Sequence, residues 1–262
     1  LRDASGQELP YQFTQIYNGD KAYENRDYNE VEVTCNVTVP AFGYTSITAE
    51  FDGNSIRQKA KDQLAAQTAQ CFTIDNGVYI AEIIQGVIRK LIKKQDQTIL
   101  YQSEKNNFGA IRLYHTTPTE NWAVNWDELA VDTFVPERVE YREQGPIRFS
   151  FVGIGRIGRH PAQLETVFVK DSPRITYRLT LDNKGCEGYF NAVFPCDRHP
   201  DLRVGIPYGE ETRDTDSLHY GKFSKEAGGD GLYVERGCDG GFYANGYVSY
   251  QSGSARLALL QG

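Results

Sequence analysis

Ile74-Asp75-Asn76-Gly77-Val78-Tyr79-Ile80-Ala81-Glu82-Ile83-Ile84 opens the stretch, reaching to Trp126, that decides the fold of this chain. An Asp-Asn-Gly turn signal leads into a run of β-branched and aromatic residues, which is typical of a largely buried strand. Gln85-Gly86 interrupts the run, and Val87 to Ile92 resumes it at once. We therefore expect the chain to reverse at Gly86 in a hairpin, where an unhindered backbone takes a positive φ.

Two further strands follow in the same pattern. A polar turn at Lys93 to Gln97 precedes the apolar run Thr98 to Tyr101, and Gly109 to Tyr114 is the next run. Antiparallel meanders of this kind start large β-sandwiches. The expected fold is all-β, with one large antiparallel β-sandwich over residues 74–262.

Residues 1–73 are expected to form a small β segment with a linker. Asp3 to Gln7 has the composition of a hairpin turn, and Tyr11 to Ile16 that of a strand. From Val31 to Val39 apolar and polar residues alternate strictly, which predicts a strand with one buried and one wet face. The alternation returns from Ile47 to Phe51, so three or four strands would make a small β-sandwich ahead of the large one.

The linker has two readings. Ile56, Ala60 and Leu64 recur at helical spacing among good helix formers, which indicates a short helix. A solvated loop explains the same polar stretch nearly as well.

The composition excludes two classes of partner. A net charge of −7 argues against nucleic acid, because a phosphate-binding surface needs clustered Lys and Arg. No apolar run approaches the length of a membrane span, so no membrane partner is expected. Neutral sugars remain compatible, because hydrogen bonds and aromatic faces recognise them.

The five cysteines are odd in number and widely scattered, at Cys35, Cys71, Cys186, Cys196 and Cys238. No C-x-x-C pair suggests zinc or redox chemistry, and most of these side chains are expected to be small buried hydrophobes. A reducing compartment, the cytoplasm, fits this pattern best.

Both ends of the chain suggest a piece of a longer protein. The chain contains no methionine and begins at Leu1 without a charged-then-apolar signal segment. The last strand pattern, Ala255 to Leu260, stops just before Gly262.

Both tryptophans, Trp122 and Trp126, lie in one segment with Asp127 and Glu128. A Trp ring beside a carboxylate is typical of sugar-binding sites, since the ring stacks on a pyranose and the carboxylate accepts hydrogen bonds from sugar hydroxyl groups. The alternative is that both rings pack in the hydrophobic core and contact no ligand.

Gly153-Ile154-Gly155-Arg156-Ile157-Gly158 matches the dinucleotide fingerprint G-x-G-x-x-G after a strand. A true fingerprint opens a long helix, whereas His160-Pro161 interrupts this segment and Val167 to Val169 returns to strand composition. We interpret the match as false and expect these glycines to relieve crowding in twisted strands or at a bulge.

A family resemblance rests on three groups of motifs. Glu165 begins the pattern E-x-x-x-x-x-x-S-P-R-I-x-Y, in two strands around a Ser-Pro turn, and Tyr189 to Pro195 follows it. The pattern resembles the C-terminal β region of α-mannosidases of glycoside hydrolase family 38. The earlier I-D-N-G-x-Y and G-V-I-R-K-L motifs and the segment Asn121 to Asp127 are similar to that region in order and spacing. The resemblance covers residues 74–200 well and the rest loosely.

The resemblance implies a galactose-mutarotase-like supersandwich that supports a catalytic barrel and lends loops to a carbohydrate-binding rim. It places the nucleophilic aspartate and the zinc in the missing N-terminal catalytic domain, so neither catalytic nor metal residues are assigned to this chain. An α-mannoside and that domain are the expected partners, and a homo-oligomer is possible. The substrate-binding candidates at the rim are Trp126, Asp127, Glu210, Arg213, His219 and Tyr243.

Three other functions compete with this non-catalytic role in an α-mannosidase. An independent carbohydrate-binding module would use Trp122, Trp126 and tyrosines such as Tyr208 and Tyr243. A self-contained hydrolase would need a carboxylate pair. A mutarotase-type sugar epimerase would use a histidine facing a carboxylate. The hydrolase candidates are Glu210, Glu211, Asp214 and Asp216, and the epimerase pair is His219 with Glu210.

Overall fold

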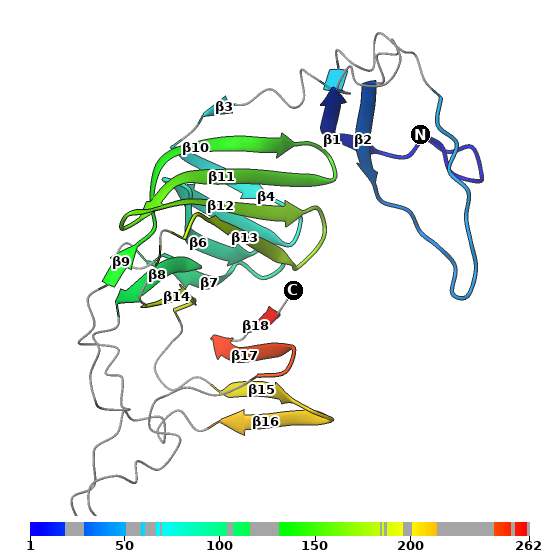
Figure 1. Ribbon diagram of the computed structural model, residues 1–262. Helices are drawn as coiled ribbons and strands as arrows, with labels where there is room; N and C mark the ends of the chain where they lie inside the picture. Colours follow the sequence, from blue (N-terminus) through cyan, green and yellow to red (C-terminus); the bar gives the residue numbers. More distant parts are fainter. Residues whose placement is uncertain are drawn as a thin grey trace, which may run out of the picture.

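The protein is a layered antiparallel β structure (Figure 1). The computed structural model describes residues 1–18, 29–50, 59–60, 67–68, 70–103, 107–115, 131–183, 185, 188–195, 201–213, 244–252 and 255–260. Within these ranges every regular element is a strand except for a helical step at Lys59–Ala60. The all-β prediction is confirmed. The remainder of the linker segment, for which a helix and a loop were both considered, lies outside the described residues.

The first layer is an antiparallel meander. Its sheet, in the order β4-β5-β6-β7, consists of β4 (Cys71–Asp75), β5 (Tyr79–Ile84), β6 (Val87–Lys93) and β7 (Thr98–Gln102). The predicted reversal lies at Gln85 and Gly86, which both have positive φ, +51° and +73°. A Cβ on Gly86 would lie 2.9 Å from a methyl of Val139 in the facing layer. Glycine at this turn thus allows both the backbone conformation and the close approach.

The second layer is longer and carries the false fingerprint. Its sheet, in the order β13-β12-β11-β10-β3, consists of β3 (Gln67–Thr68), β10 (Val135–Gln144), β11 (Arg148–Ile157), β12 (His160–Val169) and β13 (Ile175–Leu181). The fingerprint runs through β11 into the β11–β12 turn, with no helix after it. Gly155 pairs with Pro136 beside a β-bulge, and a Cβ there would collide with the Val135 carbonyl. The interpretation of these glycines as relief of crowding is confirmed.

A three-stranded sheet continues the first layer. It has the order β14-β8-β9 and consists of β8 (Ala110–His115), β9 (Val131–Thr133) and β14 (Gly188–Val193). A bridge between Ile88 and Phe108 joins it to β6. Leu113 from this sheet packs against Ile157 and Leu164 of the second layer.

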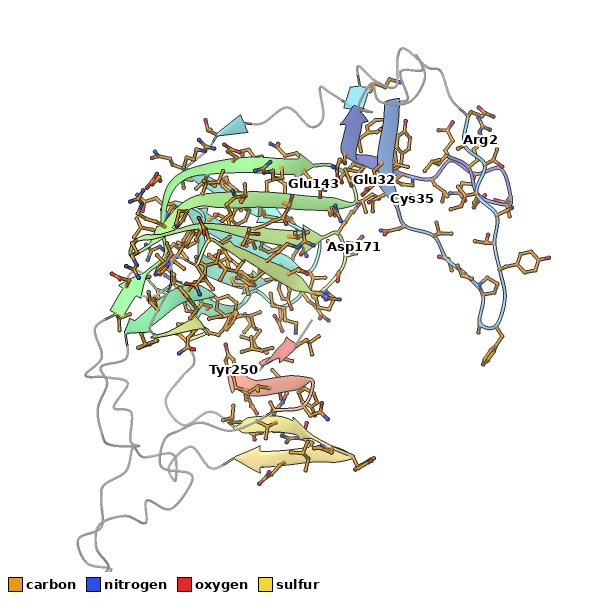
Figure 2. All side chains as sticks on the ribbon, in the orientation of Figure 1. Arg2, Glu32, Cys35, Glu143, Asp171 and Tyr250 are labelled. Carbon is orange, nitrogen blue, oxygen red and sulfur yellow. The ribbon has the colours of Figure 1, made fainter. Side chains whose placement is uncertain are left out.

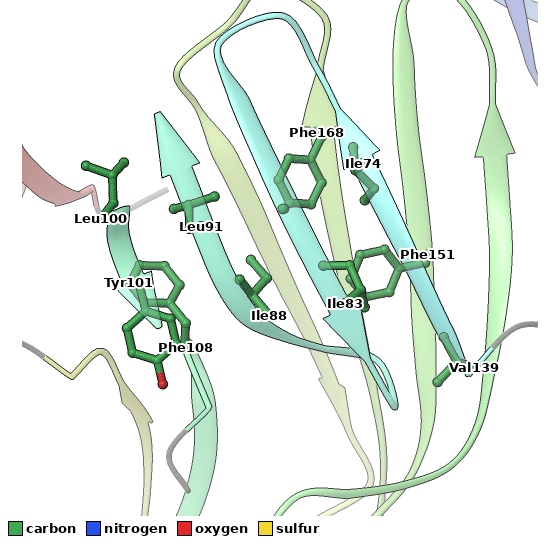
Figure 3. Packing of buried hydrophobic residues seen from close by; sticks show 11 residues of the cluster. Ile74, Ile83, Ile88, Leu91, Leu100, Tyr101, Phe108, Val139, Phe151 and Phe168 are labelled. Carbon is green, nitrogen blue, oxygen red and sulfur yellow. The ribbon is translucent and has the colours of Figure 1, made fainter. Parts of the chain in front are cut away.

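The main core lies between the two layers (Figure 3). Ile83 and Leu91 of the first layer meet Phe151 and Phe168 of the second, and all four side chains are almost completely buried. Burial of each such side chain contributes about 1.5–3 kcal/mol relative to exposure. This packing confirms a sandwich.

The C-terminal sheet lies beside the sandwich (Figure 1). It has the order β16-β15-β17-β18 and consists of β15 (Leu202–Ile206), β16 (Gly209–Arg213), β17 (Tyr247–Ser252) and β18 (Ala255–Leu260). Leu257 packs against the main core, and the Tyr250 hydroxyl donates to the Pro195 carbonyl at 3.4 Å.

The N-terminal segment differs from its prediction. Its regular strands in the described residues are β1 (Tyr11–Asn18) and β2 (Asn29–Cys35), which form a two-stranded sheet. The strand expected to reach Val39 ends at Cys35, and the valine face is not buried, since Val33 is 39% and Val39 is 53% exposed. That prediction is wrong, because the two-stranded sheet that the described residues form here is too small to bury the whole face that the alternation provides.

Gln12 fastens this N-terminal sheet to the sandwich. Its side chain is fully buried, and its Oε1 accepts the backbone N–H groups of Ile147 (3.2 Å) and Arg148 (2.9 Å) in the β10–β11 turn. The side chain occupies the space that a Cβ on Gly145 would take. The polar face of β1 therefore makes the contact with the sandwich.

Candidate functional site

The C-terminal sheet carries a polar face on the side away from the sandwich. The register pairs Arg203 with Ser249 and Gly205 with Glu210, so these four positions share one face. Tyr250 belongs to the alternate set, which packs toward the sandwich. Strand alternation thus separates an apolar inner face from a polar outer face.

Tyr247 reaches from β17 across the middle strand β15 to Glu210 on β16. Its hydroxyl donates to Glu210 Oε2 at 2.5 Å. The ring passes over Gly205, where a Cβ would lie 3.0 Å from two ring carbons of Tyr247. A larger residue at position 205 would lift the ring away from the sheet.

Two arginines extend this contact into a network. Arg203 donates from Nη1 to Glu210 Oε1 at 2.9 Å and from Nη2 to Asp201 Oδ2 at 3.4 Å. Arg256 donates to the same Asp201 oxygen at 2.5 Å. We call these residues the polar network: Asp201, Arg203, Glu210, Tyr247 and Arg256.

The network keeps both carboxylates ionised. The hydrogen bond from the Tyr247 hydroxyl, and then that from Arg203, lowers the pKa of Glu210, while Arg256 is the main cause that lowers the pKa of Asp201. Glu210 in turn raises the pKa of Tyr247. An ionised carboxylate accepts hydrogen bonds from hydroxyl groups, whereas the general acid of a glycosidase needs a raised pKa. Glu210 is therefore suited to hold a polyol and not to protonate a leaving group.

An exposed aromatic ring lies at the end of the β15–β16 hairpin. Tyr208 is 108% exposed and has a φ of +69°, next to Pro207 in the turn. A positive φ is uncommon for a residue with a large side chain. The turn thus holds the Tyr208 ring in solvent beside the strand that carries Glu210.

The rim candidates from the sequence are only partly placed. Glu210 lies in the polar network. Arg213 pairs with Leu202, so its backbone position belongs to the opposite face of the sheet from Glu210. Glu211 pairs with Val204 and therefore lies on the opposite face of the sheet from Glu210. The two carboxylates thus do not face each other as a catalytic acid–base pair would. The other candidates fall outside the described residues: Trp126, Asp127, His219 and Tyr243, as do Trp122, Asp214 and Asp216.

Sequence reasoning missed Arg203, Gly205 and Tyr247. The available signal was the alternation of β15, in which Arg203 and Gly205 stand between apolar neighbours. That signal identifies a polar face but not its partners. Cys71 is exposed and Cys35 is half-buried, and both are free thiols. The other three cysteines, to which the expectation of mostly buried side chains also applied, lie outside the described residues.

No protein-family model matches the chain, and no curated protein matches it. In the part of the chain that the structure describes, no three His, Cys, Asp or Glu side chains are grouped to hold a metal ion. The same ranges contain no helix with the length and apolar character that crossing a membrane requires.

Proposed function

We propose that this chain is the non-catalytic β-sandwich portion of an α-mannosidase-like glycoside hydrolase, supporting a catalytic barrel and contributing to its carbohydrate-binding rim. In this proposal the barrel supplies the nucleophilic aspartate and the zinc ion, and α-mannosides are the substrates. The free thiols of Cys35 and Cys71 are compatible with a reducing compartment such as the cytoplasm.

One observation carries the proposal: two motifs of the family resemblance are joined in space by Asn76. The Asn76 side chain is buried, and its Nδ2 donates to the carbonyls of Val169 (3.0 Å) and Ser172 (2.9 Å). Its Oδ1 accepts from the backbone of Val78 and Tyr79 in its own turn. The I-D-N-G and S-P-R-I motifs thus form the two ends of one contact between the layers. This supports a common architectural origin for both motifs.

The test uses the complete gene. The coding sequence ahead of Leu1 would be determined, and the encoded polypeptide would be produced with and without this chain. We expect a barrel with Asp and His metal ligands, and turnover of aryl α-mannosides only when both parts are present. Turnover by this chain alone, or a complete gene product without mannosidase activity, would contradict the proposal.

A matched pair of variants in the assembled enzyme tests the rim. Glu210→Gln removes a carboxylate from the polar network, and Glu137→Gln removes an exposed carboxylate on β10. We expect Glu210→Gln to raise KM by about three- to tenfold, because it weakens one hydrogen bond to a sugar hydroxyl. Glu137→Gln should leave KM unchanged. Equal kinetics for both variants would remove Glu210 from the rim.

A second candidate function, independent carbohydrate binding, is favoured by the polar network and the exposed Tyr208. Both lie on a sheet face that is open in the described residues. Tryptophan fluorescence would be followed during titration with mannose or mannobiose, and Tyr247→Phe should weaken a saturable signal about two- to tenfold. A flat titration would leave only the scaffold role.

A further inference from the structure

A pocket lies at the end of the sandwich where several turns meet. It has a volume of about 590 Å³, and the β4–β5, β10–β11 and β12–β13 turns contribute to its walls. Figure 2 shows Glu143 and Asp171 at this end, near the N-terminal sheet. Six of the lining residues matter here: Asp75, Lys94, Arg148, Phe149, Lys170 and Asp171.

Arg148 is held in place before any ligand arrives. The carboxylate of Glu143, which is 8% exposed, accepts hydrogen bonds from Nε and Nη2 of Arg148, and Gln12 accepts its backbone N–H. The same carboxylate raises the pKa of Arg148. Nη1 has no partner among the described residues, so a fixed guanidinium retains donors toward the pocket.

Lys94 is positioned in the same way. Its Nζ donates to Asp75 Oδ2 at 2.6 Å, and this hydrogen bond lowers the pKa of Asp75. An ammonium group has three donors, so two remain for another acceptor.

Lys170 and Asp171 are consecutive residues of the pocket lining, and they supply an unused donor and an unused acceptor. Their backbone positions are fixed, because Lys170 N–H donates to Ile147 O at 2.8 Å and Asp171 N–H donates to Asn76 O at 2.6 Å. Neither side chain has a hydrogen-bond or ion-pair partner within the described ranges. An ammonium and a carboxylate are therefore both free at the pocket.

The charges select the ligand class. Together with Glu143, the pocket residues comprise three cations and three carboxylates, so the pocket offers no net attraction to an anion. A hydroxyl group can both donate and accept a hydrogen bond, and the pocket lining provides a free ammonium donor on Lys170 and a free carboxylate acceptor on Asp171. The half-buried ring of Phe149 adds an apolar wall that suits the C–H face of a sugar. The volume lies within the range of small-molecule sites.

We propose that this pocket is a binding site for a neutral polyol of monosaccharide size, with Asp171 and Lys170 contacting adjacent hydroxyl groups and Arg148 and Lys94 donating to further oxygens. This inference rests on the pocket residues alone and concerns a site separate from the polar network. It does not depend on the presence of a catalytic barrel.

The test is a titration of the whole chain followed by ¹H–¹⁵N NMR. The probes are the methyl α-pyranosides of mannose, glucose and galactose, with inorganic phosphate and glycine as anionic and zwitterionic alternatives. We expect saturable shifts of the Gly77 and Gly145 amides with at least one pyranoside. Asp171→Asn and Lys170→Gln should each weaken that binding about tenfold, because each removes a charged hydrogen bond.

Controls separate this site from other outcomes. Glu137→Gln, which removes one negative charge outside the pocket as Asp171→Asn does within it, should leave the shifts of the Gly77 and Gly145 amides as in the unmodified chain. Preserved amide spectra would show that the Asp171→Asn and Lys170→Gln variants fold. Absence of saturable shifts at Gly77 and Gly145 with every pyranoside would overturn the proposal, as would saturation by phosphate or glycine alone.

Discussion

Gly77 lies directly against the carboxylate of Asp171. A Cβ built on Gly77 would fall 2.1 Å from Asp171 Oδ1, and Gly77 has a φ of +93°. Asp171 itself has a φ of +56°. The β4–β5 and β12–β13 turns approach this closely because residue 77 has no side chain, and this approach brings Asn76 within reach of the opposite turn.

Gly77→Ala should therefore destabilise the fold through both conformation and collision. Gly6 is the matched control, because it has a similar φ of +82° but no atom within 4 Å of its Cβ position. We expect Gly6→Ala to lower the free energy of unfolding by about 1–2 kcal/mol, and Gly77→Ala by about 1–3 kcal/mol more. Urea denaturation measures both. Adding Asp171→Gly to Gly77→Ala should restore the part of the stability that is lost to the collision with the Asp171 side chain. Equal losses of stability for Gly6→Ala and Gly77→Ala would contradict the close approach.

Asn76→Ala should cost about 2–4 kcal/mol of unfolding free energy. The substitution leaves two carbonyls and two N–H groups without their partner at a buried position. The urea midpoint should fall with an unchanged m-value. Gln95→Ala, in the exposed β6–β7 turn, should change the same quantity by less than about 0.5 kcal/mol. A comparable loss for Gln95→Ala would indicate a general sensitivity to substitution.

Substitution by alanine should have very different effects on stability at two phenylalanines, Phe151 and Phe42. Phe151 is 0% exposed between the layers, whereas Phe42 is 112% exposed at a turn with a φ of +57°. Phe151→Ala should cost about 3–5 kcal/mol, because it opens a cavity in the core. Phe42→Ala should be close to neutral, and Phe42→Gly should stabilise by up to about 1 kcal/mol by relieving the backbone. Thermal unfolding of the three variants measures their relative stabilities. A Phe42→Gly variant less stable than the unmodified chain would contradict the prediction.

The Lys94–Asp75 pair predicts a dependence of stability on pH. Lys94 lowers the folded-state pKa of Asp75 below 3.8, so the pair stabilises the fold above that value and loses its contribution as pH falls through the folded pKa. At about pH 6, Lys94→Gln should be less stable than the unmodified chain by under about 1 kcal/mol, because the pair is exposed. The difference should shrink by about pH 3. Lys170→Gln, which breaks no ion pair in the described residues, should show no such trend.

Local signals predicted most of the sandwich. The turn residues at Gln85-Gly86 and Ser172-Pro173, with alternating strands beside them, determine short-range hairpins, and both hairpins form as expected. Alternation puts Leu179 on the same face as Tyr177, yet Leu179 is 36% exposed. It lies on β13, the edge strand of its sheet, and alternation alone cannot show how far the facing layer extends.

The candidate site was less accessible to sequence reasoning. Glu210 and Tyr247 are 37 residues apart and meet across an intervening strand. Their contact depends on the registers of three strands and on Gly205 between them, and neither follows from local periodicity. Composition could identify Glu210 as a polar candidate but could not select its partners.

The buried amide of Gln12 has a consequence for any attempt to divide the molecule. The hydrogen-bond acceptor that completes the Ile147–Arg148 turn comes from the far end of the polypeptide. A recombinant product starting at residue 74 would expose two amide hydrogens there to solvent exchange and leave Gly145 without its cover. Sequence composition suggests a domain boundary near residue 74. The β10–β11 turn, however, is completed by Gln12, which lies on the N-terminal side of that boundary.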